Sequence, residues 1–462
     1  MMPRLAESQI CQPWGPRRLF AFDCVNYFHS SVLIHLRPVN FPMDTFVDPA
    51  LTRPDKFVHD NLSHDVRSHA GQLGKQSNAI DQGHSDKETV DALTKINDPQ
   101  NADFRATVFT TWDEQDIPPW INQWLVKPYA SWASTVVRRP TDIVFLTHIL
   151  LYLSTSLPSA IILYLSFSWP HAIGHWLLQS YFCGSFTLMM HNHIHNNGVL
   201  AKQYAFFDRL WPYVLSPLMG HSWNSYFYHH VKHHHVENNG PGDLSSTIRF
   251  QRDELWDFLC YVGRFLFLIW FDLPLYFARK RKGMMAFKSA GWEFCSYFFI
   301  AVLAKHNSKA TIFVLIIPLI QMRIGMMVGN WGQHALVDEQ DPDSDFRSSI
   351  TLIDVPSNRH CFNDGYHTSH HLNPRRHWRD HPVAFVKAKS QYIEGRALVF
   401  KNIDYIFMTV TLLRKDYAKL ASCLIPIGDQ IGMSQSEIAD MLKMKTKKFS
   451  EEDIMRKFGR LR

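Results

Sequence analysis

The hydrophobic residues of this 462-residue chain are concentrated between about residues 143 and 330, and both ends are polar. Residues 143–169 contain no Asp, Glu, Lys or Arg, and they exceed the roughly 20 apolar residues that a membrane-spanning helix needs. A short turn with Pro170 and Gly174 follows, and residues 175–190 form a second uncharged run. This pattern predicts a helical membrane hairpin whose second helix continues out of the membrane.

Three further apolar stretches follow, at 255–278, 291–304 and 310–329. Histidine clusters flank them, so an even number of crossings must separate the clusters if they form one site. Two stretches therefore span the membrane, and the third lies in the interface or is re-entrant. We assign the interfacial role to 255–278, because it contains charges and ends in a basic run at 279–282. The choice between it and the short 291–304 stretch stays open.

The polar ends predict less ordered structure. Residues 58–107 show no hydrophobic period, which is typical of a disordered or loosely ordered arm. Residues 117–132 are rich in Trp and Tyr, and predict an interfacial belt, with a soluble aromatic core as the alternative. The tail from 434 on predicts short capped helices with a basic face, either solvated or in contact with anionic lipid. The expected regions are a polar, partly disordered region at 1–116, a membrane domain at 117–375 and a cytosolic helical tail at 376–462.

Charge and cysteine content narrow the class of protein. The net charge of +6 is too small to indicate a nucleic-acid partner, and the seven scattered cysteines without a CxxC spacing favour a reduced compartment. Basic residues at Arg138–Arg139 and 279–282, with none in the hairpin turn, place both termini and both histidine clusters in the cytosol. For residues 1–43, which are poor in acidic residues, a transit peptide and a start at Met43 are both open.

The chain has 26 histidines, and 16 of them lie in the windows 191–235 and 334–381. Box one is His191-Asn-His-Ile-His195. His191 and His195 share one helical face and can bind one metal, whereas His193 points elsewhere, to a second shell or to solvent. Box two spans 229–235, and its register is ambiguous. We favour His230, His233 and His234. The alternatives are His229 with His233 and His234, or His230 with His234 and His235.

Box three has a single register. His367, His370 and His371 form an HxxHH motif whose three imidazoles lie on one helical face. Asn363 and Asp364 precede it and could cap the helix or orient a ligand. A further pair, Asn330 and His334, lies four residues apart just after the last apolar stretch. Because imidazole also binds zinc, copper and nickel, the boxes alone predict a polyhistidine metal site and not a particular metal.

The order of these motifs resembles the membrane-bound fatty acid desaturase and hydroxylase superfamily over about residues 140–375, and the stretch YHHVKHHHVENNGPGDLSST resembles eukaryotic members, in particular fungal ones. The resemblance implies an all-α, multi-span membrane helical bundle of about four transmembrane helices, with a cytosolic helical cap that holds two iron ions. It implies nine ligands: His191, His195, His230, His233, His234, His334, His367, His370 and His371. Asn330 matches a residue that contacts iron through water in acyl-CoA desaturases.

The resemblance also implies an activity, namely O2-dependent introduction of a double bond into an acyl or related lipid chain at the endoplasmic reticulum. Box one has three residues between its histidines, where acyl-CoA desaturases have four, so the carrier of the chain (lipid or CoA) stays open. No HPGG haem signature occurs, so a separate donor, cytochrome b5 with its reductase, is expected.

Three alternatives remain. The same site could belong to a hydroxylase or other oxygenase of a lipid or polyketide-like chain, including one in secondary metabolism. A membrane metal transporter or metal-binding protein is a rival from another class. It is disfavoured because its histidines would line a path within the spans, whereas these lie at helix exits. An inactive scaffold is disfavoured because all the boxes are intact.

Overall fold

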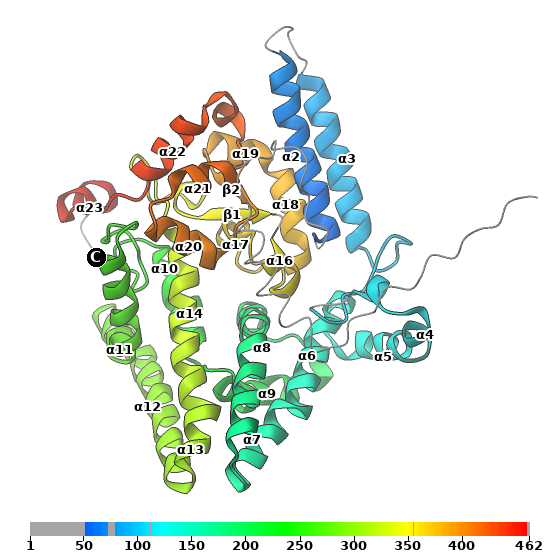
Figure 1. Ribbon diagram of the computed structural model, residues 1–462, viewed down its shortest axis with the longest axis vertical. Helices are drawn as coiled ribbons and strands as arrows, with labels where there is room; N and C mark the ends of the chain where they lie inside the picture. Colours follow the sequence, from blue (N-terminus) through cyan, green and yellow to red (C-terminus); the bar gives the residue numbers. More distant parts are fainter. Residues whose placement is uncertain (1–50, 73–78, 111–112, 354, 460–462) are drawn as a thin grey trace, which may run out of the picture. The chain divides into compact units, whose positions relative to one another are not determined.

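The computed structural model describes residues 51–72, 79–110, 113–353 and 355–459, which lie in one unit, Val47–Arg462. The transit peptide and the start at Met43 considered above lie outside these residues. The described chain is mostly helical (Figure 1). The helices up to box three are α2 (Arg53–Gln72), α3 (Ala79–Asn97), α4 (Pro119–Ile121), α5 (Lys127–Val136), α6 (Ile143–Ser154), α7 (Ser156–Leu165), α8 (Trp169–Asn196), α9 (Ala205–Leu218), α10 (His235–Glu237), α11 (Leu255–Arg279), α12 (Gly283–His306), α13 (Ser308–Thr311), α14 (Ile317–His334), α15 (Asp345–Ser348) and α16 (Pro356–His360).

The predicted hairpin begins with two short helices, α6 and α7, in place of one long helix. Pro158 explains the break, because proline has no N–H to bond back to the preceding turn and its ring clashes with that turn. The second helix, α8, runs unbroken and carries box one in its last turns, as predicted. It ends where Asn197 adopts a left-handed conformation, with φ 54°.

Three helical segments are long and apolar enough to cross a membrane among the described residues: Pro140–Leu165, Leu255–Arg279 and Ser308–His334. The second of these is the stretch that we assigned to the interface. Its charges are less costly than the sequence suggests, because Arg264 and Asp272 form an ion pair at 3.1 Å. The helix α8, which contains the predicted 175–190 span, is not among the three. Neither is α12, which contains the predicted 291–304 span and follows α11. Which of the neighbouring helices α11 and α12 crosses the bilayer stays a prediction.

Exposed aromatic side chains cover parts of this membrane region. Phe267 on α11 and Phe287 and Phe294 on α12 are each more than two-thirds exposed, which fits contact with lipid. In the predicted belt, Trp120 and Trp124 are also exposed. They therefore do not form the soluble aromatic core that was the alternative.

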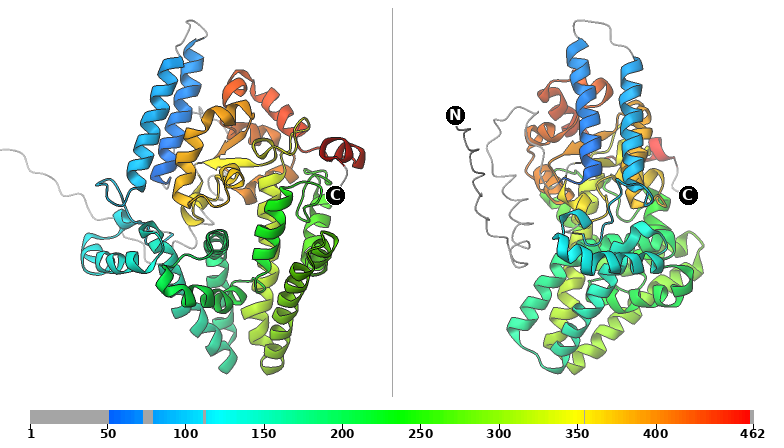
Figure 2. Two further views of the ribbon diagram at one scale, coloured as in Figure 1. Left: turned by 180° about the vertical axis from the view of Figure 1, so that it is seen from behind. Right: turned by 90° about the vertical axis from the view of Figure 1, so that its right-hand side faces the viewer.

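The predicted disordered arm is instead largely helical. The helices α2 and α3 lie side by side (Figures 1 and 2). They bury Val58, Leu62 and Leu93 in a cluster shared with the C-terminal part of the chain. Lys389 pairs there with Asp65 at 2.5 Å. The two helices have few apolar residues, so their order depends on this long-range docking, which local sequence does not reveal.

The region around and after box three is more than a helical tail. Its elements are β1 (Ile350–Ile353), α17 (His367–Leu372), α18 (His381–Lys387), α19 (Lys389–Glu394), β2 (Leu398–Lys401), α20 (Tyr405–Leu413), α21 (Tyr417–Cys423), α22 (Gln435–Met444) and α23 (Glu451–Phe458). The strands β1 and β2 pair in parallel and are almost wholly buried, so the all-α prediction missed a small sheet. The last two helices begin with capping boxes at Ser434 and Ser450, which confirms the short capped helices.

The pair of helices α2 and α3 contacts the segment before box three through Asp55 on α2. This buried carboxylate accepts hydrogen bonds from Tyr366 Oη at 2.7 Å and from Asn358 Nδ2 at 3.0 Å. Tyr366 directly precedes His367, and Asn358 Oδ1 accepts from the backbone N–H of Gly365 at 2.8 Å. The pair of helices α2 and α3 therefore supports the segment that leads into the HxxHH helix.

We expect Asp55→Ala to destabilise the protein by about 3 kcal/mol, because Tyr366 Oη loses its acceptor and Asn358 Nδ2 keeps only the carbonyl of Leu352. The unfolding temperature of the purified protein in detergent measures this loss. Asp60→Ala is the matched control, because Asp60 lies on the same helix and its side chain is 70% exposed. Equal unfolding temperatures for the two variants would contradict the prediction.

Candidate metal centre

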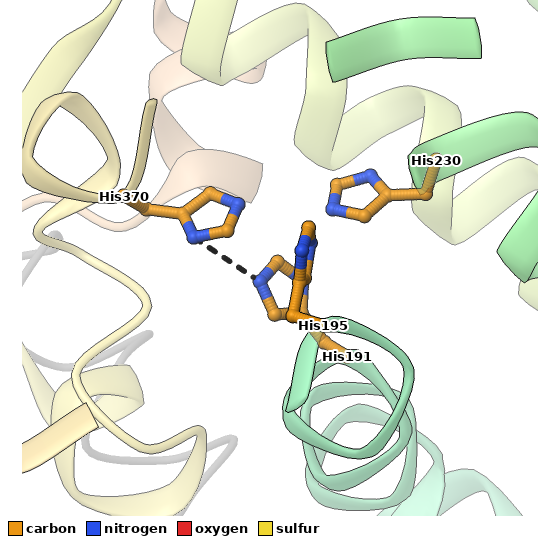
Figure 3. Close-up of side chains that lie close together, drawn as sticks. All are labelled: His191, His195, His230 and His370. Carbon is orange, nitrogen blue, oxygen red and sulfur yellow. Dashed lines mark hydrogen bonds between the residues drawn. The ribbon is translucent and has the colours of Figure 1, made fainter. Parts of the chain in front are cut away.

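Nine histidines from four helical segments come together in two groups. The end of α8 contributes His191 and His195, and the end of α14 contributes His334. Box two lies mainly in a π-helix, Phe227–His234, and box three in α17. Figure 3 shows the rings of His191, His195, His230 and His370 meeting from three of these segments.

The first group consists of those four histidines, which each place a ring nitrogen within 4.8 Å of the others. His191 Nε2 lies 3.4 Å from His370 Nδ1. A fifth ring joins them, since His235 Nε2 lies 3.1 Å from His230 Nε2 and 2.8 Å from His370 Nε2. His195 Nε2 is buried, and no described residue offers it a hydrogen-bond partner.

The second group consists of His234, His334 and His371, whose ring nitrogens also lie within 4.8 Å of one another. His367 joins this group, because its Nε2 lies 3.0 Å from His334 Nε2 and 3.1 Å from His371 Nε2. The sequence-predicted histidines of box three are thereby divided between the two groups, with His370 in the first.

Outer partners fix the tautomers in the second group. His234 Nδ1 lies 2.7 Å from Asp243 Oδ2, His334 Nδ1 lies 2.9 Å from the carbonyl of Ser348, and His371 Nδ1 lies 2.6 Å from Asn238 Oδ1. Those oxygens can only accept, so each Nδ1 carries the proton and each Nε2 a lone pair. Lone pairs that converge in this way repel unless a cation lies among them. The donor set therefore fits a metal ion such as iron.

The rings are also held in the form that binds metals. Burial, together with neighbouring imidazoles, holds the pKa of His230, His367 and His370 well below its usual range. These rings are therefore neutral near pH 7. Metal binding requires no proton to be removed from them.

The histidines of the third register lie at the two groups, whereas His229, His233 and Asp243 lie together as a further set that could hold a metal ion. In a π-helix the turn is longer, so that His230, His234 and His235 reach the groups. His233, which we favoured, instead lies beside Asp243, with its Nδ1 3.7 Å from Oδ1. His229 packs against Phe265. Nothing in the sequence indicates a π-helix.

The other sequence candidates lie around the groups. His193 contacts Asp208, with 3.0 Å between its Nε2 and the carbonyl oxygen, and faces away from both. Asn330 donates to the carbonyl of Ser245 at 3.0 Å and to Tyr261 Oη at 2.7 Å. Asp364 lines a cavity together with His191 and His370. Burial raises the pKa of Asp364 to about 7.

Sequence reasoning missed Asp243 and Asn238. Both lie in the polar stretch ENNGPGD just after box two, where their proximity to the histidines was the only available signal. Asp243 also accepts from Ser245 Oγ at 2.7 Å. Although burial alone would raise it, His234 and His233 hold the pKa of Asp243 well below its usual range. The group is therefore a buried carboxylate that orients a metal-ligand candidate.

We expect Asp243→Ala to lower the metal affinity of the second group by about 10- to 100-fold, because the His234 tautomer is no longer fixed. Metal content of the purified protein, measured across a series of chelator concentrations, reports this change. Asp416→Asn, which keeps an exposed helix cap at Asp416, is the control and should match the unmodified protein. Metal retention equal to that control would refute the role of Asp243.

A second cavity lies between box two and three long helices. Its lining includes Tyr226 and His229, Phe265 and Ile269 of α11, Glu293 of α12 and Arg323 of α14. Tyr226 also links this cavity to the first group, since its hydroxyl lies 3.2 Å from His191 Nδ1.

Comparison with known proteins gives one result. The model of the fatty acid desaturase family matches residues 166–401, more than half of the chain, and this range contains all nine grouped histidines. Comparison with curated proteins and with solved structures gives no match. The candidate spans and the histidine groups are compatible with a membrane protein that has a di-iron site. The chain belongs to the fatty acid desaturase family.

Proposed function

We propose that this protein is a membrane desaturase that uses two iron ions and O2 to introduce a double bond into an acyl or related lipid chain. The family supports a desaturase- or hydroxylase-type activity. The observation that carries the proposal is the convergence of Nε2 lone pairs in the second group, each fixed by an outer hydrogen bond.

The proposed ligand set differs from the one implied by resemblance at a single position, where His235 replaces His233. One iron would be held by His191, His195, His230, His235 and His370, and the other by His234, His334, His367 and His371. Asn330 acts indirectly, through the Ser245 segment that supports Asp243.

When bound, the irons would supply the activation of O2 that removes hydrogen from an unactivated methylene, which side-chain acids and bases cannot do. The protein positions the chain and keeps water out. The second cavity supports this role, because apolar side chains of α11 line it together with Tyr226, which contacts His191. A chain held there would present only selected carbons to the centre.

The membrane and the electron donor are inferred from the family and from the charge pattern of the sequence. The protein would lie in the endoplasmic reticulum membrane with its histidine groups on the cytosolic side, and a separate cytochrome b5 and its reductase would supply electrons. The arrangement disfavours a transporter. The grouped histidines come from helix ends and from the segments between helices, not from the middle of a candidate span.

Expression in a eukaryotic microsomal host with lipid profiling tests the proposal. A product lighter by two hydrogen atoms supports a desaturase, and a product heavier by one oxygen atom supports the hydroxylase alternative on the same site. Purified protein should contain two iron ions per chain and consume O2. If the purified protein binds other metals but contains no iron and consumes no O2, the proposal is overturned.

A further inference from the structure

The second cavity is lined by apolar side chains and by two charged ones. Phe265, Ile269 and Leu273 form its apolar wall, and Glu293 and Arg323 line it as well. Arg323 lies within the candidate span Ser308–His334. A cavity built only to seal a hydrocarbon chain would not need charged groups there.

The two charges form one buried pair. Arg323 Nη2 lies 2.9 Å from Glu293 Oε2, and the two side chains are 8% and 9% exposed. Arg323 Nη2 also donates to Tyr297 Oη at 2.9 Å, and Ser222 Oγ donates to Glu293 Oε1 at 2.5 Å. The pair is therefore held by further hydrogen bonds, yet it borders the cavity.

Such a pair is costly in a membrane. Desolvation of two charges is often not recovered by their attraction, so a buried pair is weak evidence for stability. Ionisable groups within spans are by default candidates for a function. The pair has no net charge, and this limits what it can bind. An anionic group would meet Glu293 as well as Arg323, whereas a neutral hydroxyl can donate to the carboxylate and accept from the guanidinium.

We propose that the Glu293–Arg323 pair recognises a hydroxyl group on the substrate chain, so that the substrate is a hydroxylated acyl chain and not a plain one. This inference rests on the proposed function, because it takes the cavity to be the place of the chain. Ser225 and Ser289 add further polar atoms to the cavity lining, and Phe265 to Leu273 hold the methylenes.

Competition binding to the iron-loaded protein in detergent tests this assignment. Tritiated octadecanoic acid is the probe, and octadecanoic acid and its positional monohydroxy isomers are the competitors. At least one isomer should compete about tenfold more strongly than octadecanoic acid, as expected when a hydrogen bond to a charged group is gained. In the double variant Glu293→Leu with Arg323→Met, which removes both charges together, the preference should disappear.

Two further variants keep the test decisive. Glu293→Gln with Arg323→Gln retains hydrogen-bonding groups, so if the apolar variant does not fold, this one should still reduce the preference by about threefold. Ile269→Trp fills the cavity and should weaken binding of both kinds of acid. Size-exclusion profile and iron content establish that each variant is folded.

The outcomes separate the two claims. If Ile269→Trp weakens octadecanoic acid binding but no isomer is preferred, or the preference survives removal of both charges, the hydroxyl assignment is wrong and the proposed function stands. If Ile269→Trp changes neither acid, the chain does not occupy this cavity, which overturns the inference together with that part of the proposed function.

Discussion

Substitution of His370 by alanine should abolish product formation while the protein stays in the membrane. His370 lies between two other rings of the first group, with its Nδ1 3.4 Å from His191 Nε2 and its Nε2 2.8 Å from His235 Nε2. Its loss removes a ligand candidate and leaves a buried space among neutral rings. We expect activity to fall by more than about a hundredfold, beyond the effect of losing an outer partner.

Product analysis in the microsomal host, together with iron content and the membrane-bound amount of protein, measures this result. His193→Gln is the matched control. His193 belongs to the same box as His191 but contacts Asp208 outside both groups, and glutamine keeps a donor for that contact. The control should retain its iron and its activity. Full activity of the His370→Ala variant would refute the site assignment.

Arg252→Ala should cause the largest loss of stability, on the order of 4 kcal/mol, because several buried carbonyl groups lose a charged donor. The Arg252 side chain is fully buried. It donates to the carbonyls of Ala335 at 2.9 Å and Lys445 at 3.0 Å, and also to those of Lys447 and Thr247. It thus joins the segment after box two, the segment after α14 and the link between α22 and α23.

The unfolding temperature and the monodisperse fraction in detergent measure this loss. Arg249→Ala is the control, because Arg249 forms a partly exposed ion pair with Glu451 at 2.8 Å. Exposed ion pairs contribute less than about 1 kcal/mol. If the two arginine variants unfold at the same temperature, Arg252 does not join these segments in the way described.

The sequence predicted the parts of the site that depend on local periodicity. Box one at the end of α8 and the HxxHH face of box three follow from i, i+3 and i+4 spacing. The position of His235 beside His370, and of His233 beside Asp243, could not be predicted, because a π-helical turn changes the spacing and has no clear sequence signature. Asp243 could not be ranked above its polar neighbours without knowing where the chain turns back.

Long-range contacts account for the remaining differences in the fold. The pairing of β1 with β2 joins segments about 50 residues apart, and four-residue strands are too short for a reliable alternation of side chains. The helices α2 and α3 are stabilised by contacts such as Lys389 with Asp65. The stretch 255–278 was assigned to the interface because of its charged residues. Arg264 and Asp272 form an ion pair, so fewer unpaired charges remain in this stretch than the sequence suggests.

Box two connects the two histidine groups directly. His234 belongs to one group and His235 to the other, so a single peptide unit, with Cα atoms about 3.8 Å apart, connects the two. A ring cannot shift to receive one ion without moving the backbone that holds the next ring. We therefore expect cooperative loading, in which iron titration followed by native mass spectrometry shows empty and doubly loaded chains and few singly loaded ones. The two ions would then be gained and lost as a unit.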